Sequence, residues 1–211
     1  YTSPTSWTGQ TADWEVLSNR LHLNVIPLTA PYTTYLSTPS TAIENATWEF
    51  TVDLVGTTAG GSFVEVFLTS DQANINSATA TGYFVRIGET NDEVSLFHSA
   101  LGVNTMIING INGRTSNTNP HVKVRVARTC AGNWTLESDT TLAGVNYVTE
   151  GTVNHTLTTT SSYFGVLTTY ATSARRTWCF VDNITVTNAA CPDLTPPTVL
   201  SVVPTSASQA T

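Results

Sequence analysis

The chain has 211 residues, of which 40% are hydrophobic and only 11% are charged. One Lys and seven Arg stand against fifteen acidic residues, for a net charge of −7. This balance excludes nucleic acid as a partner and disfavours anionic membrane surfaces, because both require clustered cations. No run of apolar residues is long enough to predict a membrane span.

Segments in which apolar and polar residues alternate recur along the chain and predict short strands. An early pair, 14–17 and 20–23, is separated by Ser18 and Asn19, which predicts a tight hairpin. The clearest later strands span 48–54, 63–69, 83–87, 94–98, 122–128, 134–138, 163–170 and 178–186. No stretch shows a helical period. The pattern predicts an all-β fold, a two-sheet antiparallel jelly-roll β-sandwich, with an immunoglobulin-like connection as the alternative.

The alternation also predicts which side chains face the core, because successive residues of a strand point to opposite faces of the sheet. In the strand 48–54 the inward set is Trp48, Phe50, Val52 and Leu54. In the strand 122–128 the inward set is Val122, Val124 and Val126, and Lys123 and Arg125 point outward.

The composition changes after Val186. Four prolines in the segment that follows exclude a helix and favour an extended linker. We therefore expect a sandwich domain over 1–188 and a Pro-rich linker over 189–211 that contains one lone strand, TVLSVV. A single strand cannot bury its own face, so this strand either opens a following domain or docks on something else.

Cys130, Cys179 and Cys191 are too few for a disulfide scaffold and lack the spacing of a metal site. In an oxidising compartment the simplest arrangement is one disulfide and one free thiol. Cys191 lies just beyond the last predicted strand, where a disulfide would staple the tail to the sandwich. The chain begins at Tyr1 with no Met and no apolar leader, which favours a mature secreted product or a cut fragment.

Catalytic patterns are largely missing from the sequence. A glycoside hydrolase needs two carboxyl groups about 5 to 9.5 Å apart. Glu49 and Asp53 share one face of a predicted strand but lie roughly 13 Å apart by strand rise. The four His residues show no metal-binding spacing. We therefore expect no enzyme activity and keep a divergent glycoside hydrolase as an alternative.

Four segments carry a resemblance to a known family: TGYFVRIGETNDEVSLFHS, HVKVRVARTCAGNWTLESD, SSYFGVLTTYATS and WCFVDNITVT. Taken in order, they resemble the concanavalin A-like (LamG/glucanase-like) jelly-roll domain of large secreted surface proteins of Bacteroidetes-type bacteria. The resemblance covers about residues 5–188. The tail PPTVLSVVPTSASQAT resembles the opening strand of a bacterial Ig-like module. Family members usually have a further acidic strand before the WTG segment, and without it an open edge would remain for another chain.

The resemblance implies a calcium site. Asp182 matches the acidic residue with which such sandwiches tie the N-terminal loop to the last strand. A loop carboxylate such as Asp13, together with backbone carbonyls, would complete the oxygen ligands that Ca²⁺ requires. The alternative is that Asp182 caps a bulge with Asn183.

A sugar-binding face needs aromatic platforms beside planar hydrogen-bonding groups. The alternation predicts one on a single concave sheet, with Trp134 near its rim and an outward set of Glu65, Phe67, Arg86, Lys123 and Arg125. The alternative is an ordinary polar sheet face with salt bridges.

The leading hypothesis is a non-catalytic extracellular binding or adhesion module of a larger cell-surface protein, with a glycan or a surface protein as its partner. The alternative from another class is a structural subunit of an extracellular filament. In that case residues 192–211 of one copy would complete the sandwich of the next.

Overall fold

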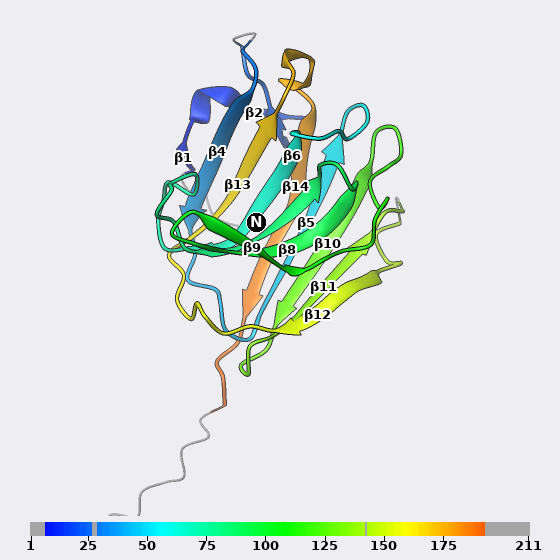
Figure 1. Ribbon diagram of the computed structural model, residues 1–211. Coiled ribbons are helices and arrows are strands. Elements are labelled where there is room, and N and C mark those ends of the chain that lie inside the picture. The colour runs from blue at the N-terminus through cyan, green and yellow to red at the C-terminus, as the bar shows by residue number, and fades with distance from the viewer. Residues whose placement is uncertain (1–6, 27–28, 142, 193–211) are drawn as a thin grey trace, which may run out of the picture.

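The computed structural model describes residues 7–26, 29–141 and 143–192, and within them the chain forms two seven-stranded sheets (Figure 1). Sheet A contains, in spatial order, β1 (Thr8–Gly9), β4 (Tyr32–Pro39), β13 (Tyr163–Tyr170), β6 (Phe63–Ser70), β7 (Gly82–Gly88), β8 (Glu93–Ala100) and β9 (Val103–Ile108). Sheet B contains β12 (Val148–Asn154), β11 (Asn133–Asp139), β10 (His121–Arg128), β5 (Ala46–Leu54), β14 (Cys179–Asn188), β3 (Arg20–Leu23) and β2 (Trp14–Leu17). Two short 3-10 turns are Thr11–Asp13 and Ser173–Arg175.

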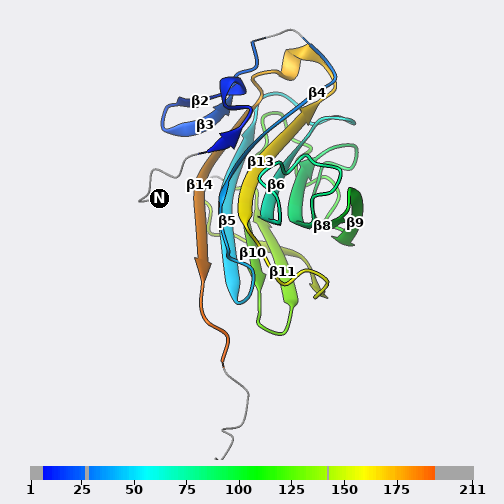
Figure 2. The same ribbon diagram turned by 90° about the vertical axis from the view of Figure 1, so that its left-hand side faces the viewer.

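The predicted two-sheet jelly roll is confirmed. Paired strands run antiparallel, and consecutive strands repeatedly change sheet, as when β4 of sheet A is followed by β5 of sheet B and then by β6 of sheet A. Figure 2 shows the molecule from the side, with β14 of sheet B on the left and β8 and β9 of sheet A on the right. In Figure 1 the steep β4 and β13 give way to the nearly horizontal β8 and β9, so sheet A is strongly twisted.

The ten predicted strands lie on β2, β3, β5, β6, β7, β8, β10, β11, β13 and β14, and four further strands escaped prediction. β9 and β12 are edge strands with mostly exposed side chains, so they show little alternation. In β4, threonine occupies some of the positions that face the core: Thr34 and Thr38 are buried. Strands that bury little hydrocarbon, or that bury threonine, carry a weak sequence signal.

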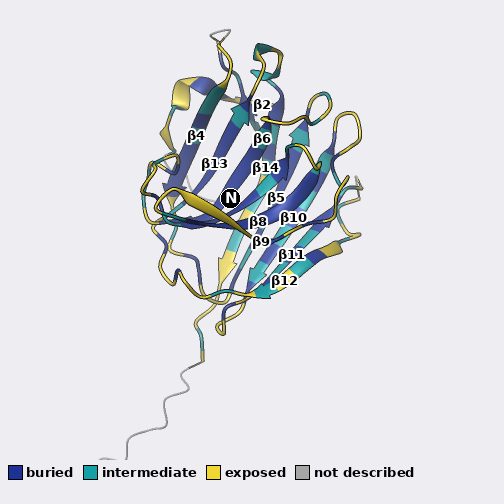
Figure 3. Ribbon diagram, in the orientation of Figure 1, coloured by how far each residue is buried: buried dark blue, intermediate teal, exposed yellow. Residues whose placement is uncertain are grey.

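The main core lies between the two sheets and contains the predicted inward residues. Trp48, Phe50 and Val52 are fully buried, as are Val122 and Val124. Figure 3 shows this buried layer along the central strands, with exposed residues gathered at the loops and on β9. Burial of a large aromatic side chain contributes several kcal/mol, so this layer dominates the stability of the sandwich.

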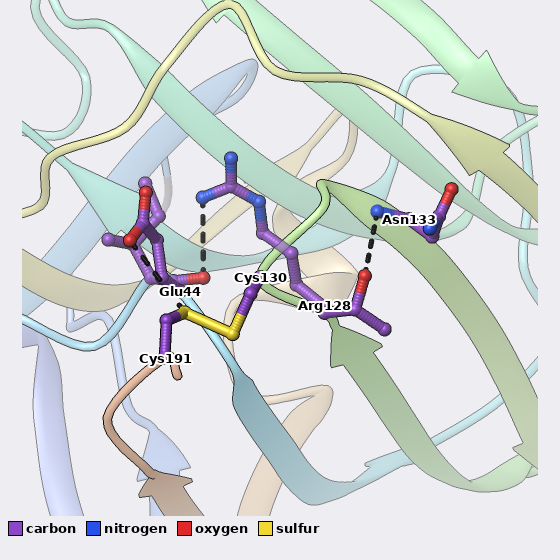
Figure 4. The surroundings of a disulfide bond; sticks show 7 residues. Glu44, Arg128, Cys130, Asn133 and Cys191 are labelled. Atoms are coloured by element: carbon purple, nitrogen blue, oxygen red, sulfur yellow. Dashed lines mark hydrogen bonds between the residues drawn. A yellow bond between two sulfur atoms is a disulfide. The ribbon is translucent and has the colours of Figure 1, made fainter. Parts of the chain in front are cut away.

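One disulfide is present, between Cys130 and Cys191, whose Cα atoms are 5.6 Å apart (Figure 4). It joins the turn after β10 to the chain just beyond β14. The expected staple between tail and sandwich is therefore confirmed. Cys179 is a buried free cysteine, and burial raises the pKa of its thiol. A protonated, buried thiol is a poor nucleophile, so Cys179 serves packing.

Within the described ranges, the structure contains no helix long and apolar enough to cross a membrane. The tail strand TVLSVV and the predicted boundary between a sandwich and a following segment fall mostly in 193–211, outside the described residues. They stay predictions.

Candidate functional site

The outer face of sheet A has an aromatic floor. Phe67, Phe84 and Phe97 lie opposite one another on β6, β7 and β8. Their ring centroids are 4.9 and 5.1 Å apart in succession. Ile75, from the loop between β6 and β7, packs on the same cluster. The three rings are therefore buried although they lie on the side of the sheet that faces away from the main core.

Arg86 lies on this floor and is held by two carboxylates. Its Nε and Nη2 donate to Glu65 Oε1 at 3.0 and 2.7 Å, and its Nη1 donates to Glu89 Oε2 at 2.9 Å. The guanidinium carbon lies 4.4 Å from the Phe63 ring centroid and 4.7 Å from that of Phe97. The planar cation is thus fixed by ion pairs at its edge and by aromatic faces below it.

A cleft of about 270 Å³, with both polar and apolar lining, opens beside Arg86. We call it the Arg86 cleft, and it is lined by Arg86, Glu89, Asn91, Glu93, Phe97 and Met106, among others. Glu93 begins β8 and is only 7% exposed. Its Oε2 atom is buried and has no hydrogen-bond partner in the part of the chain that the structure describes. A buried carboxylate oxygen without a donor costs free energy, which a donor entering the cleft would recover.

A second, smaller cleft of about 150 Å³ lies on the same sheet face. Glu65 lines it together with Asn76, Ser99 and Asn104. Because Glu65 also binds Arg86, one ion pair forms the boundary between the two clefts. Amide, hydroxyl and carboxylate groups along such a face can both donate and accept hydrogen bonds.

The electrostatics of this face favour an electrically neutral ligand. Glu65 and Glu89 bind the guanidinium of Arg86, and a third carboxylate, on Glu93, lines the same cleft. Burial raises the pKa of the Glu65 carboxyl, and Arg86 opposes that rise. The positive charge of Arg86 is already committed to two carboxylates, so an anionic ligand would meet excess negative charge.

The six predicted ligand-binding residues do not share one sheet, and this prediction was wrong in its geometry. Glu65, Phe67 and Arg86 lie on sheet A, whereas Lys123 and Arg125 lie on β10 of sheet B. The reason is the jelly-roll connection, which sends strands with the same alternation to different sheets. Phe67 is also buried, so it offers no exposed stacking platform.

Trp134 does not lie at a rim. It is fully buried between the sheets and stacks on Trp48 with ring centroids 5.8 Å apart. Its Nε1 donates to the carbonyl of His155 at 3.0 Å. Trp134 starts the inward set of β11 with Leu136, and a large ring on that side fills the core.

Asp13 and Asp182 do not form the expected calcium site. Val181 pairs with Leu21, and Leu21 pairs with Val16, so Asp182 is level with the far end of β2. Asp13 precedes β2 at its other end, which puts the two carboxylates well over 10 Å apart by strand rise and strand spacing. Asp13 accepts a hydrogen bond from Tyr32 at 2.9 Å instead. Among the described residues, no group of three or more His, Cys, Asp or Glu could hold a metal ion.

Glu49 and Asp53, the carboxylates weighed for hydrolysis, lie on the outer face of sheet B. Asp53 accepts from Arg20 at 2.8 Å and contacts His121. Glu49 lies 4.0 Å from Arg125. Both carboxylates are engaged by cations on an open sheet face, and they remain four residues apart on one strand.

Sequence reasoning missed Glu89, Asn91 and Glu93. The sequence does contain a signal for Glu93. Glu93, Ser95 and Phe97 are every second residue of β8, so all three face the outer side of the sheet. Glu89 and Asn91 follow β7 in a loop, where alternation predicts nothing about direction. Only the fold brings them beside Arg86.

The chain matches no known family model and no curated protein. Similar solved structures do exist. The carbohydrate-binding module CBM66 from Bacillus subtilis has a TM-score of 0.59 and 13% identity, covering 88% of this chain and 98% of that one. The VIP36 exoplasmic/lumenal domain in its Ca²⁺/mannose-bound form has a TM-score of 0.65 and 11% identity, covering 90% and 85%. A legume lectin-like domain from Entamoeba histolytica has a TM-score of 0.54 and 11% identity, covering 88% and 90%.

At such identities the likeness shows the fold alone. It confirms the concanavalin A-like jelly-roll fold that the sequence resemblance implied. The bacterial source and the Ig-like module at the C-terminus stay predictions.

Proposed function

We propose that this chain is a non-catalytic carbohydrate-binding module and that its glycan occupies the Arg86 cleft. One observation carries the proposal: Glu93 lines the cleft, and its buried Oε2 lacks a hydrogen-bond donor among the described residues. A sugar hydroxyl supplies such a donor in a charge-assisted hydrogen bond. Asn91 and the second carboxylate oxygen of Glu89 add further polar partners, and Met106, which is 40% exposed, offers apolar surface to the C–H groups of a sugar ring.

The same groups define the ligand class. Three carboxylates around one committed arginine favour neutral glycans and disfavour uronic acids. The second cleft, with Asn76, Ser99 and Asn104, would take a neighbouring sugar unit of an oligosaccharide. Two small polar clefts on one sheet face suit a chain of sugars better than a single compact ligand.

The comparisons support the proposal through the fold. CBM66 is a carbohydrate-binding module by its name, and one VIP36 structure is a mannose-bound form. The Cys130–Cys191 disulfide supports an oxidising, extracellular setting, in which we propose that the module belongs to a larger surface protein. A filament subunit is the second candidate function, and it is favoured by the edge of β14, which no described strand covers beyond Val181.

Glycan binding is tested by calorimetry with neutral oligosaccharides built from glucose, mannose, galactose or fructose, and with uronic-acid polymers. We expect binding of at least one neutral glycan. Glu93→Gln should weaken it by roughly 10- to 100-fold, the cost of one charge-assisted hydrogen bond. The matched control Glu137→Gln, on the outer face of sheet B, should bind like the parent protein. Equal binding by Glu93→Gln, or no binding to any glycan, contradicts the proposal.

Two further measurements complete the test. Reducing-end assays after long incubation with the bound glycan should show no cleavage, and cleavage that Glu93→Gln abolishes would make the module an enzyme. Titrations in Ca²⁺ and in EDTA address the calcium prediction. Binding that requires Ca²⁺ and is lost in Asp182→Asn would restore Asp182 as a metal ligand.

A further inference from the structure

β14 has a long backbone edge that has no neighbour among the described residues. On one side it pairs with β5 over most of its length, up to Asn188. On the other side β3 pairs only with Phe180 and Val181. Among the described residues, no strand pairs with 182–188 on that side. Figure 2 shows β14 continuing below the β2–β3 hairpin. Unpaired N–H and C=O groups along such an edge are a template for another strand.

An apolar groove adjoins this edge. Its volume is about 470 Å³. Trp7, Val16, Leu21 and Ile184 supply much of its apolar lining, and Arg20 and Asp182 also line it. Val16 is 77% exposed, although it belongs to a strand. The pairing of β14 with β5 shifts register between Asp182 and Thr185, so the bulge lies where the β3 pairing stops. Beyond the bulge, residues 185–188 of β14 pair regularly with β5, and no described strand lies on their other side.

We propose that residues 198–203 of a second copy of this chain bind along β14 and into this groove. The segment reads TVLSVV and is rich in β-branched residues. Pro196 and Pro197 precede it and Pro204 follows it, which limits the strand to six residues. Such a strand cannot bury its own face. Residues 182–188 of β14 offer it a backbone edge, of which 185–188 lie beyond the bulge.

The disulfide favours a second copy over the chain's own tail. Cys191 is bonded to Cys130, which follows β10. The order β10-β5-β14-β3 places β10 on the side of β14 away from the free edge. The tail therefore starts on the opposite side of the strand that it would pair with. A contact between the tail of one copy and the β14 groove of the next is heterologous and propagates head to tail.

The test uses the full chain and measures its assembly by sedimentation velocity and negative-stain electron microscopy. We expect head-to-tail dimers and longer chains that grow with concentration. The double variant Leu200→Asp/Val202→Asp should weaken association by roughly tenfold or more, because a carboxylate buried in an apolar groove is costly. Its matched control, Ala207→Asp/Ala210→Asp, adds the same charge outside the strand and should assemble like the parent.

The groove is tested from the other side with Val16→Asp, which should weaken association to a similar extent. Its control is Val103→Asp. This variant makes the same substitution at a 67% exposed valine on β9 of sheet A, away from the groove. Mixing Val16→Asp with Leu200→Asp/Val202→Asp should give a discrete 1:1 pair, since one intact tail and one intact groove remain.

A parent protein that stays monomeric at high concentration overturns the proposal, and so does assembly that the tail variants leave unchanged. The proposal is also overturned if the tail of each monomer occupies its own groove. Crosslinking between position 16 and the tail within one chain would identify that case. Glycan binding by these variants is measured in parallel. Since the Arg86 cleft lies on the other sheet, loss of assembly with intact glycan binding separates this proposal from the proposed function.

Discussion

The outer faces of the two sheets carry the same kinds of charged side chain in different surroundings. On sheet A the side chains of Arg86 and Glu65 are 18% and 7% exposed, over an aromatic floor. On sheet B the side chains of Arg125 and Glu49 are 36% and 32% exposed. A buried ion pair holds charges whose hydration has been removed, whereas an exposed pair exchanges its partner for water at little cost. The comparison teaches that Arg86 and Glu65 meet a larger desolvation penalty than Arg125 and Glu49.

The largest expected effect is the loss of Arg86. Arg86→Ala leaves the buried Glu65 carboxylate without its cation and should lower the free energy of unfolding by about 3 to 5 kcal/mol. Arg125→Ala should cost no more than about 1 kcal/mol. Urea denaturation at pH 7 measures both. The double variant Glu65→Met/Arg86→Met should regain most of the loss, and equal effects of Arg86→Ala and Arg125→Ala would erase the distinction between the faces.

The second prediction is a gain in stability at Glu93. Glu93→Leu removes a buried, unpartnered carboxylate oxygen and should raise the free energy of unfolding of the ligand-free protein by about 1 to 3 kcal/mol. The same change should abolish glycan binding. Glu137→Leu, which breaks an exposed pair with Arg125, should bring no such gain. Thermal unfolding without and with glycan measures the change, and destabilisation by Glu93→Leu would show that Glu93 supports the fold.

Two neighbouring histidines, His98 and His155, make the free energy of unfolding depend on pH. Burial first, and His155 next, lower the pKa of His98, while burial and Arg128 lower that of His155. The folded state thus binds protons less readily than the unfolded chain. The resulting stability is present above the ordinary histidine pKa of about 6.5 and is lost as the pH falls below it.

We therefore expect the unfolding midpoint in urea to drop between pH 7 and pH 5. Tyr83 Oη and His155 Nδ1 are 2.8 Å apart, and His98 Nε2 lies 2.9 Å from Thr158 Oγ1, so both rings are held by neutral partners. In His98→Gln the drop should be smaller. A midpoint that is flat in this range, or a drop unchanged in the variant, would show that these histidines do not govern the acid response.

The smallest effect concerns salt. A double-mutant cycle on Arg125 and Glu137, whose Nε and Oε2 are 2.7 Å apart, should give a coupling of about 0.2 to 1 kcal/mol that fades in 1 M NaCl. The same cycle on Glu65 and Arg86 should give a larger coupling that salt barely changes. Two couplings with the same salt dependence would mean that solvent reaches both faces equally.

Much of the fold was predictable because alternation is a local property of a strand. The residues of β5 and β10 that were predicted to face the core do so. Glu65 and Arg86 lie on the outer face of their sheet, as predicted. The shared sheet expected for Arg86 and Arg125 was wrong, because the side of a strand says nothing about which sheet the strand joins. Trp134 and Leu136 are two residues apart on β11 and so face the same side, which is the core. The alternation therefore indicated a buried Trp134, and the prediction that it lies at a rim overlooked this.

The sequence by itself determined an all-β sandwich, its inward residues and a single disulfide with one thiol left over. These follow from the two-residue period of a strand and from the number of cysteines. Tertiary structure alone decided that Cys130 pairs with Cys191, that Glu93 lines a cleft with Arg86, and that no described strand pairs with residues 182–188 on one side of β14. Each of these depends on which distant strands become neighbours, and that choice is made by the closure of two sheets around a shared core.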